Sequence, residues 1–390
     1  MSRVLFPSAT DTEQRKIEHL IVCSEEEVEA KVLTTGFEDV FLIHRAIPEI
    51  DMDEVNTSVE LFGRALSAPF IITAMTGGAP ETAPLNEKLA KAAKRTGIGI
   101  GVGSQRAAIE DPSLEHTYRI IRDNAPENLV IANLGAPQFS KGYGTIEAEK
   151  AIAMVDADCL AIHLNALQEA IQPEGDTNYS GVLYRLKELS DTLETPIIAK
   201  ETGAGICSED ARRLEQAGVA GIDISGAGGT SWAGVEAIRA KNRKQLDREQ
   251  LGMLFWDWGI PTAVTTIEVV TTIQGVVLSS GGIRTGLDVA KALALGANAA
   301  GAALPFLKVA VTPEKIEKRI IEYINGLKIT MFLTGCRTIQ DLQKRSKVVI
   351  TGRTREWLQM RGFDLTQYSH RCCNTNNIHT SEILDPSKVQ

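Results

Sequence analysis

The sequence predicts an α/β fold, a single (β/α)8 TIM barrel, on three observations. The 390 residues are 43% hydrophobic and 23% charged, which is typical of a soluble globular protein with a large core. From residue 69 onward, short apolar runs alternate with amphipathic stretches of roughly ten to fifteen residues, as in parallel strands joined by helices. Eight such units span about 240 residues, close to the usual length of a barrel.

The strands and helices are expected in strict alternation. The predicted strands lie at 69–75, 98–102, 129–133, 159–164, 196–200, 221–224, 275–279 and 298–301. The predicted helices lie near 84–95, 113–123, 145–154, 180–192, 208–217, 261–272, 286–295 and from 305 onward. Because the strands are almost continuously apolar, both of their faces are expected to be covered. A doubly wound open sheet is the alternative, but it requires a G-x-G-x-x-G turn that Met75-Thr-Gly-Gly78 does not supply.

Four segments lie outside this alternation. The basic pair Arg15 and Lys16 begins a short N-terminal helix, which is either solvated or folded over the barrel mouth. Residues 39–50 are expected to close the bottom of the barrel. Residues 226–260, glycine-rich, then charged, then aromatic, fit a lid that orders over a ligand. We expect one domain over 1–365 and a disordered tail over 366–390.

Composition excludes several classes of function. The net charge of −9 argues against nonspecific binding to nucleic acid or to an anionic membrane. The chain has no apolar run of membrane-spanning length and no N-terminal signal core. Its six cysteines show no C-x-x-C spacing, which favours reduced thiols and a cytoplasmic location.

Polar residues at the strand ends indicate where the site lies, since the C-terminal ends of barrel strands converge. After the fourth strand, His163, Asn165, Gln168 and Glu169 follow within a few residues, and His163 and Asn165 share a strand face. Alone, this stretch fits a solvated loop as well as a site. Small or polar residues at all eight ends favour a site.

Two of these strand ends suggest specific chemistry. Gly281 and Gly282 precede a helix that starts near Gly286, and free backbone N–H groups at a helix start bind phosphate, with Arg284 as an added cation. Lys200, at the end of the fifth strand, has three interpretations. It forms a Schiff base, it stabilises an anionic ring such as reduced flavin, or it is solvated.

Taken together, the strand-end motifs resemble those of the type 2 isopentenyl diphosphate isomerases. The motifs are Met75-Thr-Gly-Gly78, Gly103-Ser-Gln-Arg106, His163-Leu-Asn-x-x-Gln-Glu169, Lys200-Glu-Thr-Gly203, Gly228-Gly-Thr-Ser-Trp232 and Ser280-Gly-Gly-Ile-Arg284. The resemblance runs from Arg15 to about Leu365 and implies an FMN-dependent barrel. It also implies interconversion of isopentenyl and dimethylallyl diphosphate, reduced FMN as acid and base, Mg²⁺, NADPH or NADH as reductant, and a homo-tetramer or homo-octamer.

The resemblance assigns residues to each ligand. The residues implied for FMN are Thr76, Gly77, Ser104, Asn133, Lys200, Thr230, Gly281, Gly282, Arg284, Ala302 and Ala303. Those implied for the prenyl diphosphate are Arg15, Lys16, His19, Arg106, His163, Asn165 and Gln168. Glu169 is implied as the Mg²⁺ ligand, and Gln168, Lys200 and Glu236, the last acting through water, as catalytic residues. The segment Gly301-Ala-Ala303 departs from the family pattern, because a basic residue is expected after its first glycine.

Three rival functions remain at this stage. A 2-hydroxy-acid oxidase needs a histidine base beside Gly-Gly-Arg, and the corresponding segment Ser225-Gly-Ala-Gly-Gly-Thr230 has none. A Schiff-base lyase would use Lys200. A non-catalytic prenyl-phosphate binder would not need the complete flavin set together with Glu169.

Overall fold

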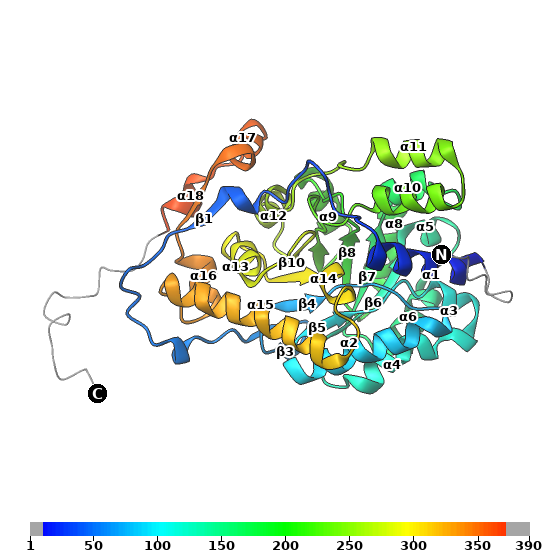
Figure 1. Cartoon of the computed structure of the whole chain (residues 1–390), viewed down its shortest axis with the longest axis horizontal. Coiled ribbons are helices and arrows are strands. Elements are labelled where there is room, and N and C mark those ends of the chain that lie inside the picture. Colours follow the sequence, from blue (N-terminus) through cyan, green and yellow to red (C-terminus); the bar gives the residue numbers. More distant parts are fainter. Residues whose placement is uncertain (1–10, 372–390) are drawn as a thin grey trace, which may run out of the picture.

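A closed barrel of eight parallel strands forms the centre of the protein. The computed structural model describes residues 11–371 (Figure 1). The barrel strands pair in chain order and the last pairs with the first: β4 Phe70–Ile72, β5 Gly99–Gly101, β6 Val130–Gly135, β7 Cys159–Leu164, β8 Ile197–Glu201, β9 Gly221–Asp223, β10 Val276–Ser280 and β11 Ala299–Ala302. Each predicted strand coincides with one of these, so the barrel prediction is confirmed.

Helices cover the outside of the barrel. Those that follow the strands are α2 Ala83–Thr96, α4 His116–Asn124, α6 Thr145–Val155, α8 Val182–Thr192, α9 Ser208–Gln216, α12 Thr262–Val270, α13 Gly286–Ala294 and α15 Pro313–Leu333. Apolar side chains of strands and helices form the main core of the protein. The strand register places three polar residues side by side. The Cα atoms of His163 and Lys200 are partners in β7–β8, and those of Lys200 and Asp223 are partners in β8–β9.

A hairpin closes the N-terminal end of the barrel. It consists of β2 Val59–Leu61 and β3 Arg64–Leu66, and its Leu61 and Leu66 are buried against residues from the beginnings of the strands, such as Ile71 and Cys159. The prediction that residues 39–50 close this end is wrong. There, β1 Val40–Leu42 pairs with β12 Val348–Ile350 outside the barrel, with Phe41 exposed.

The segment predicted as a lid between β9 and β10 is largely helical. It contains α10 Trp232–Asn242 and α11 Leu246–Leu254. The two helices approach closely at Gly252, where a Cβ atom would lie 2.7 Å from the Ala237 side chain. The segment is therefore a helical unit and not the long loop that the lid prediction assumed. Its charged residues misled the interpretation, because Glu236 and Arg239 face inward and are buried in ion pairs.

Further short elements complete the chain. They are α1 Asp11–Glu25, α3 Arg106–Glu110, α5 Ala136–Ser140, α7 Ala166–Ile171, α14 Leu304–Leu307, α16 Ile339–Lys344, α17 Gly352–Met360, α18 Thr366–Ser369 and the 3-10 turns η1 Phe37–Asp39, η2 Met52–Glu54, η3 Pro80–Thr82 and η4 Pro112–Leu114. In α1, Val22 and Cys23 pack with Val235 of α10 and Leu304 of α14. Within residues 11–371, no helix is long and apolar enough to cross a membrane.

The first residues of the predicted tail, 366–371, pack against the barrel. Tyr368 of α18 is buried, and its hydroxyl donates to the Leu295 carbonyl oxygen at 3.1 Å. Arg371 donates to the carbonyl oxygens of Ala294 at 2.7 Å and Ser346 at 3.1 Å. The boundary is corrected accordingly, because these contacts anchor 366–371 to the barrel. The rest of the predicted tail, 372–390, lies outside the described residues.

Candidate active site

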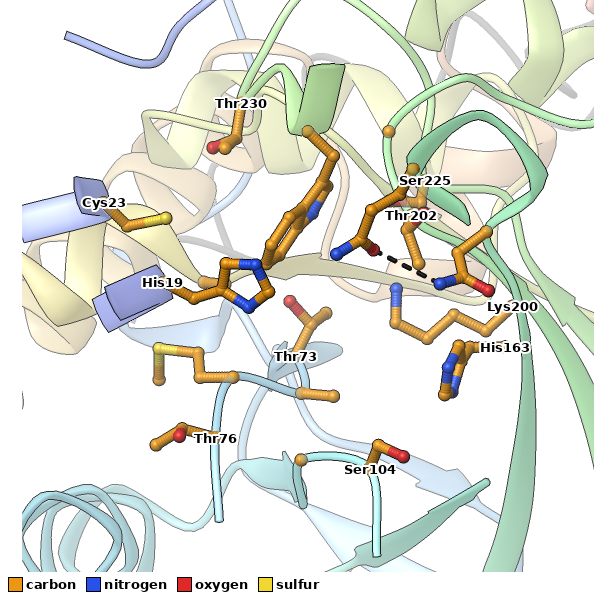
Figure 2. A pocket seen from close by; sticks show the side chains of 18 of the residues that line it. His19, Cys23, Thr73, Thr76, Ser104, His163, Lys200, Thr202, Ser225 and Thr230 are labelled. Atoms are coloured by element: carbon orange, nitrogen blue, oxygen red, sulfur yellow. Dashed lines mark hydrogen bonds between the residues drawn. The ribbon is translucent and has the colours of Figure 1, made fainter. Parts of the chain in front are cut away.

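A cavity of about 250 Å³ lies at the C-terminal end of the barrel, between the strand ends and α1 (Figure 2). It brings together nearly all the residues that the sequence assigned. The assigned residues that line it are Arg15, Lys16, His19, Thr76, Ser104, Arg106, Asn133, His163, Asn165, Gln168, Glu169, Lys200, Thr230, Gly281, Gly282, Arg284, Ala302 and Ala303. Gly77 and Glu236 do not line it. Gly77 instead contacts Lys16 through its carbonyl oxygen.

Lys200 enters the cavity from β8 as a buried ammonium group with a counter-ion. It donates to the Glu201 carbonyl oxygen at 2.8 Å, and its Nζ lies 3.4 Å from Asp223 Oδ2 of the neighbouring strand. The other Asp223 oxygen accepts from the Ser280 hydroxyl. Lys200 is only 9% exposed, so the solvated interpretation is wrong, and an ion-paired ammonium is a poor nucleophile for a Schiff base.

His163 is held as a neutral imidazole. The Asn133 amide nitrogen donates to the Val102 carbonyl oxygen at 3.1 Å, which fixes the orientation of the amide. The Asn133 amide oxygen therefore faces His163 and accepts a hydrogen bond from Nδ1 at 2.9 Å. Burial, aided by the positive charges of Lys200 and Lys16, lowers the His163 pKa to about 3. The remaining nitrogen, Nε2, is therefore an acceptor, which suits a hydrogen bond from water or from a protonated ligand oxygen.

Glu169 is a carboxylate fixed by its own loop. Its Oε1 accepts from the Asn165 amide at 2.8 Å. Its Oε2 accepts from the Gln172 amide at 2.7 Å and from the Asp176 backbone N–H at 2.6 Å. No cluster of three or more His, Cys, Asp or Glu side chains in the described part of the chain could hold a metal. One carboxylate suits Mg²⁺ that arrives with phosphate oxygens and keeps several waters.

Three cations, Arg15, Lys16 and Arg106, also line the cavity. Burial, followed by the charges of Arg15 and Arg106, lowers the Lys16 pKa to about 7. Its ammonium contacts the carbonyl oxygen of Ser104 at 2.9 Å and the Tyr118 hydroxyl at 2.7 Å. Burial likewise lowers the Arg15 pKa, and Arg106 adds to that shift. Like charges held together in a cavity favour a multiply charged anion as their ligand.

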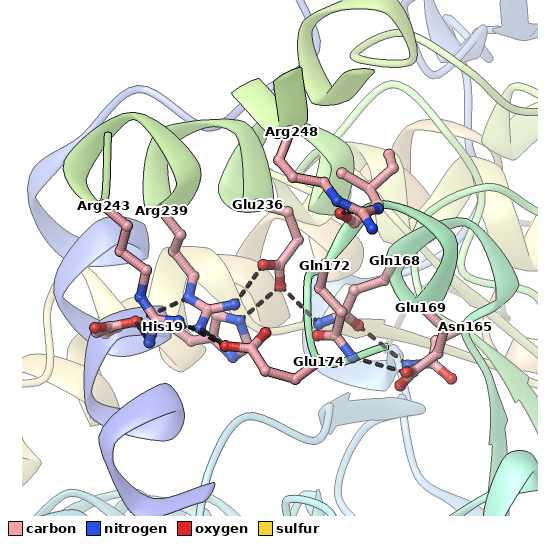
Figure 3. Close-up of polar contacts among 12 residues, drawn as sticks. His19, Asn165, Gln168, Glu169, Gln172, Glu174, Glu236, Arg239, Arg243 and Arg248 are labelled. Carbon is pink, nitrogen blue, oxygen red and sulfur yellow. Dashed lines mark hydrogen bonds and ion pairs between the residues drawn. The ribbon is translucent and has the colours of Figure 1, made fainter. Parts of the chain in front are cut away.

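Glu236 lies behind His19 and Gln168 as a buried anchor (Figure 3). It is 1% exposed and accepts from His19 Nε2 at 2.7 Å, from the Gln168 amide at 3.2 Å and from Arg239. Burial alone would raise its pKa, but His19 and Arg239 lower it to about 2. Such a carboxylate is ionised at neutral pH and is poorly suited to donate a proton.

Sequence reasoning missed several residues of this region. Asp223, Tyr118, Arg239 and Arg243 make contacts that depend on segments far away in the chain. Trp232 was noted only as part of a motif, yet its ring meets the His19 ring edge-on at 5.1 Å. Only the position of Asp223, at the end of a strand, could have drawn attention to it.

Comparison with known proteins decides the family. The chain matches the FMN-dependent dehydrogenase family over residues 9–117 and 169–349. It is 52% identical over 359 residues to an isopentenyl-diphosphate delta-isomerase of Methanosarcina mazei, covering 92% of this chain and 97% of that protein. The chain belongs to the type 2 isopentenyl-diphosphate delta-isomerases. A member of the family from Methanothermobacter thermautotrophicus is 49% identical over 358 residues, covering 92% of this chain and 99% of that protein.

Solved structures show the same fold at lower identity. The structure of a mandelate oxidase variant superposes with a TM-score of 0.60 at 20% identity, covering 87% of this chain and 99% of that one. A mandelate oxidase with (S)-2-phenylpropionate gives a TM-score of 0.59 at 18% identity, covering 85% of this chain and 94% of that one. The predicted FMN-type barrel and the predicted isomerase family are both confirmed.

The cavity residues fit an FMN, the cofactor of the family. A buried ammonium, Lys200, faces the centre of the cavity, where an anionic ring would need a positive charge. Gly281 and Gly282 have φ angles of 96° and 69°, and an added Cβ atom would lie 2.1 Å from the Gly226 carbonyl oxygen or 2.3 Å from the Thr35 side chain, so this tight turn at the cavity edge requires glycine. Arg284 lies at the same end, with its Nε donating to Glu29 at 2.7 Å.

Proposed function

We propose that the protein isomerises isopentenyl and dimethylallyl diphosphate with FMN that must be reduced, and that Mg²⁺ binds the diphosphate. The observation that carries this proposal is that three clustered cations and one fixed carboxylate line the same cavity. Arg15, Lys16 and Arg106 supply the positive charge, and Glu169 faces the same space. The phosphate oxygens of a diphosphate suit the three cations, and a Mg²⁺ ion bound to the diphosphate suits the carboxylate.

The chain's own residues have separable tasks in this proposal. Arg15, Lys16 and Arg106 bind the diphosphate, Glu169 binds Mg²⁺, and the Asn165 amide orients that carboxylate. The neutral His163 accepts a hydrogen bond from a metal-bound water or a protonated phosphate oxygen. His19 binds substrate from α1 while Glu236 holds its ring.

Reduced FMN, when bound, supplies a proton donor and acceptor beside the hydrocarbon end of the substrate. Lys200 would lie beside its ring and stabilise negative charge there. The backbone of Gly281, Gly282, Ala302 and Ala303 would hold the phosphate, with Thr76, Ser104, Asn133, Thr230 and Arg284 as further contacts. Gln168, anchored by Glu236, would orient the reacting carbons or relay a proton through water.

Two further parts of the proposal rest on resemblance to the family, and a third rests on the cysteines. NADPH or NADH would reduce the flavin, and the assembly would be a homo-tetramer or homo-octamer. A cytoplasmic location is supported by the free thiols of Cys23, Cys159 and Cys207.

An omission assay tests the proposal. Purified protein is incubated anaerobically with isopentenyl diphosphate, FMN, NADPH and Mg²⁺, and dimethylallyl diphosphate is measured as each component is left out. We expect product only when FMN, a reductant and Mg²⁺ are all present. Product at full rate without Mg²⁺, or without flavin, would contradict the proposal.

A further inference from the structure

Four charged side chains, Glu18, Glu174, Arg239 and Arg243, form a closed ring beside the cavity, and Figure 3 labels the last three. Glu18 Oε2 lies 3.1 Å from Arg239 and 2.8 Å from Arg243. Glu174 Oε1 lies 3.4 Å from Arg239 and 2.6 Å from Arg243. Each arginine therefore contacts both carboxylates, and the ring joins α1, the loop after α7 and the helix α10.

The members of the ring differ in exposure. The Arg239 side chain is 2% exposed, whereas those of Arg243, Glu18 and Glu174 are 29%, 25% and 33% exposed. A buried guanidinium without partners would be costly, so Arg239 requires its carboxylates. The other three can be replaced one at a time without leaving a fully buried charge unpaired.

The ring joins the two segments that carry the proposed diphosphate ligands. Glu18 is on α1 with Arg15, Lys16 and His19, the cationic side of the cavity. Glu174 is in the same loop as Asp176, whose backbone N–H fixes Glu169 on the metal side.

The helical unit α10–α11 is the frame for both segments. Arg239 also contacts Glu236, which holds His19 of α1 and Gln168 of α7. Arg248 of α11 donates to the carbonyl oxygens of Ala170 and Ile171 at the end of α7, each at 3.3 Å. A shift of α10 would thus be transmitted to both walls of the cavity.

We propose that this ring fixes α1 against the loop after α7, which contains Glu174 and Asp176. Arg243 and Glu174 are then positioning residues for binding of the diphosphate. The inference rests on the proposed function for its ligand. An isolated surface ion pair stabilises little, because solvent screens it and ordering two side chains costs entropy. Here two of the four contacts are made by one buried arginine, Arg239, which is already ordered, and Arg243 contacts the same two carboxylates, so the network holds α1 more firmly than separate pairs would.

Trypsin cleavage after Arg15 and Lys16 measures the docking of α1 without substrate. Arg243→Gln removes two of the four contacts, and we expect these bonds to be cut about fivefold faster, the equivalent of ~1 kcal/mol. The readout is the intact mass of the chains that begin at Lys16 or Ile17, under conditions where cleavage follows the opening equilibrium. Arg243→Lys keeps the charge and is expected to restore much of the protection.

Two further variants make the test specific. Glu174→Gln is expected to accelerate cleavage similarly, and the double variant Glu174→Gln/Arg243→Gln less than the product of the two effects, because they share a contact. Arg185→Gln is the matched control. Arg185 is an exposed arginine that pairs with Glu188 of the same helix at 2.6 Å, and its loss should leave cleavage unchanged.

Steady-state kinetics then separate positioning from chemistry. In Arg243→Gln the KM for isopentenyl diphosphate should rise while kcat stays within about twofold. Cleavage at the wild-type rate, or a tenfold fall in kcat at constant KM, would overturn the inference. Failure of the proposed function is distinguishable, because an Arg243 variant of an inactive protein would still show faster cleavage.

Discussion

Glu236→Gln tests the view that Glu236 is an ionised anchor. The side chain is 1% exposed, and His19 and Arg239 lower its pKa from 4.5 to about 2. Because the pKa is lower in the folded than in the unfolded protein, the stabilisation is complete above about pH 4.5 and is lost as the pH falls toward 2. It amounts to about 3 kcal/mol at neutral pH. Glutamine keeps the shape and one acceptor but removes the charge.

Thermal unfolding of the purified protein measures this loss. With an unfolding entropy of about 2.1 cal/mol/K per residue and 390 residues, about 3 kcal/mol corresponds to a fall in Tm of about 4 °C. By about pH 3 more than half of the difference between variant and wild type should have disappeared. Glu188→Gln, on the exposed face of α8, is the control. A Tm unchanged at neutral pH, or a loss independent of pH, would refute the reasoning.

Three other variants probe the cavity. Glu169→Gln should raise the Mg²⁺ concentration needed for half-maximal activity by at least about tenfold, since a carboxylate ligand is lost, while FMN content by absorbance stays unchanged; loss of flavin would contradict the assignment. Because burial lowers the Lys16 pKa to about 7, its charge is lost as pH rises through that value, so kcat/KM should fall above about pH 7. In Lys16→Arg the charge persists and this fall should be absent. A pH profile of the variant identical to that of the wild type would exclude Lys16 from substrate binding. Lys200→Met should lower the midpoint potential of bound FMN by about 30 mV, a tenfold loss of preference for the reduced form, and an unchanged potential would remove Lys200 from the flavin site.

The barrel was predictable because parallel strands covered on both faces are apolar runs. Cys159–Leu164 was predicted at its observed bounds for this reason. In a barrel the C-terminal ends of all eight strands meet at one face. The predicted strand ends therefore indicated most of the residues that line the cavity. The hairpin β2–β3 was missed because its short strands, unlike the equally short barrel strands β4, β5 and β9, lie outside the regular alternation of strands and helices.

Long-range charge compensation was not predictable. The run from Arg239 to Glu249 has the composition of a solvated loop, yet Arg239 is buried because Glu18 and Glu174 come from distant segments to meet it. The neutral state of His163 likewise depends on Asn133 and on the buried charge of Lys200. Such states depend on which groups surround a side chain, and one-dimensional patterns do not contain that information.

The most direct test of the central claim is product formation per reduced flavin. The purified holoprotein is reduced anaerobically without added NADPH, and isopentenyl diphosphate and Mg²⁺ are supplied. We expect many molecules of dimethylallyl diphosphate per flavin, with the flavin spectrum still reduced at the end, and no product from the oxidised protein. Product limited to one per flavin, or full turnover by the oxidised protein in air, would contradict the account.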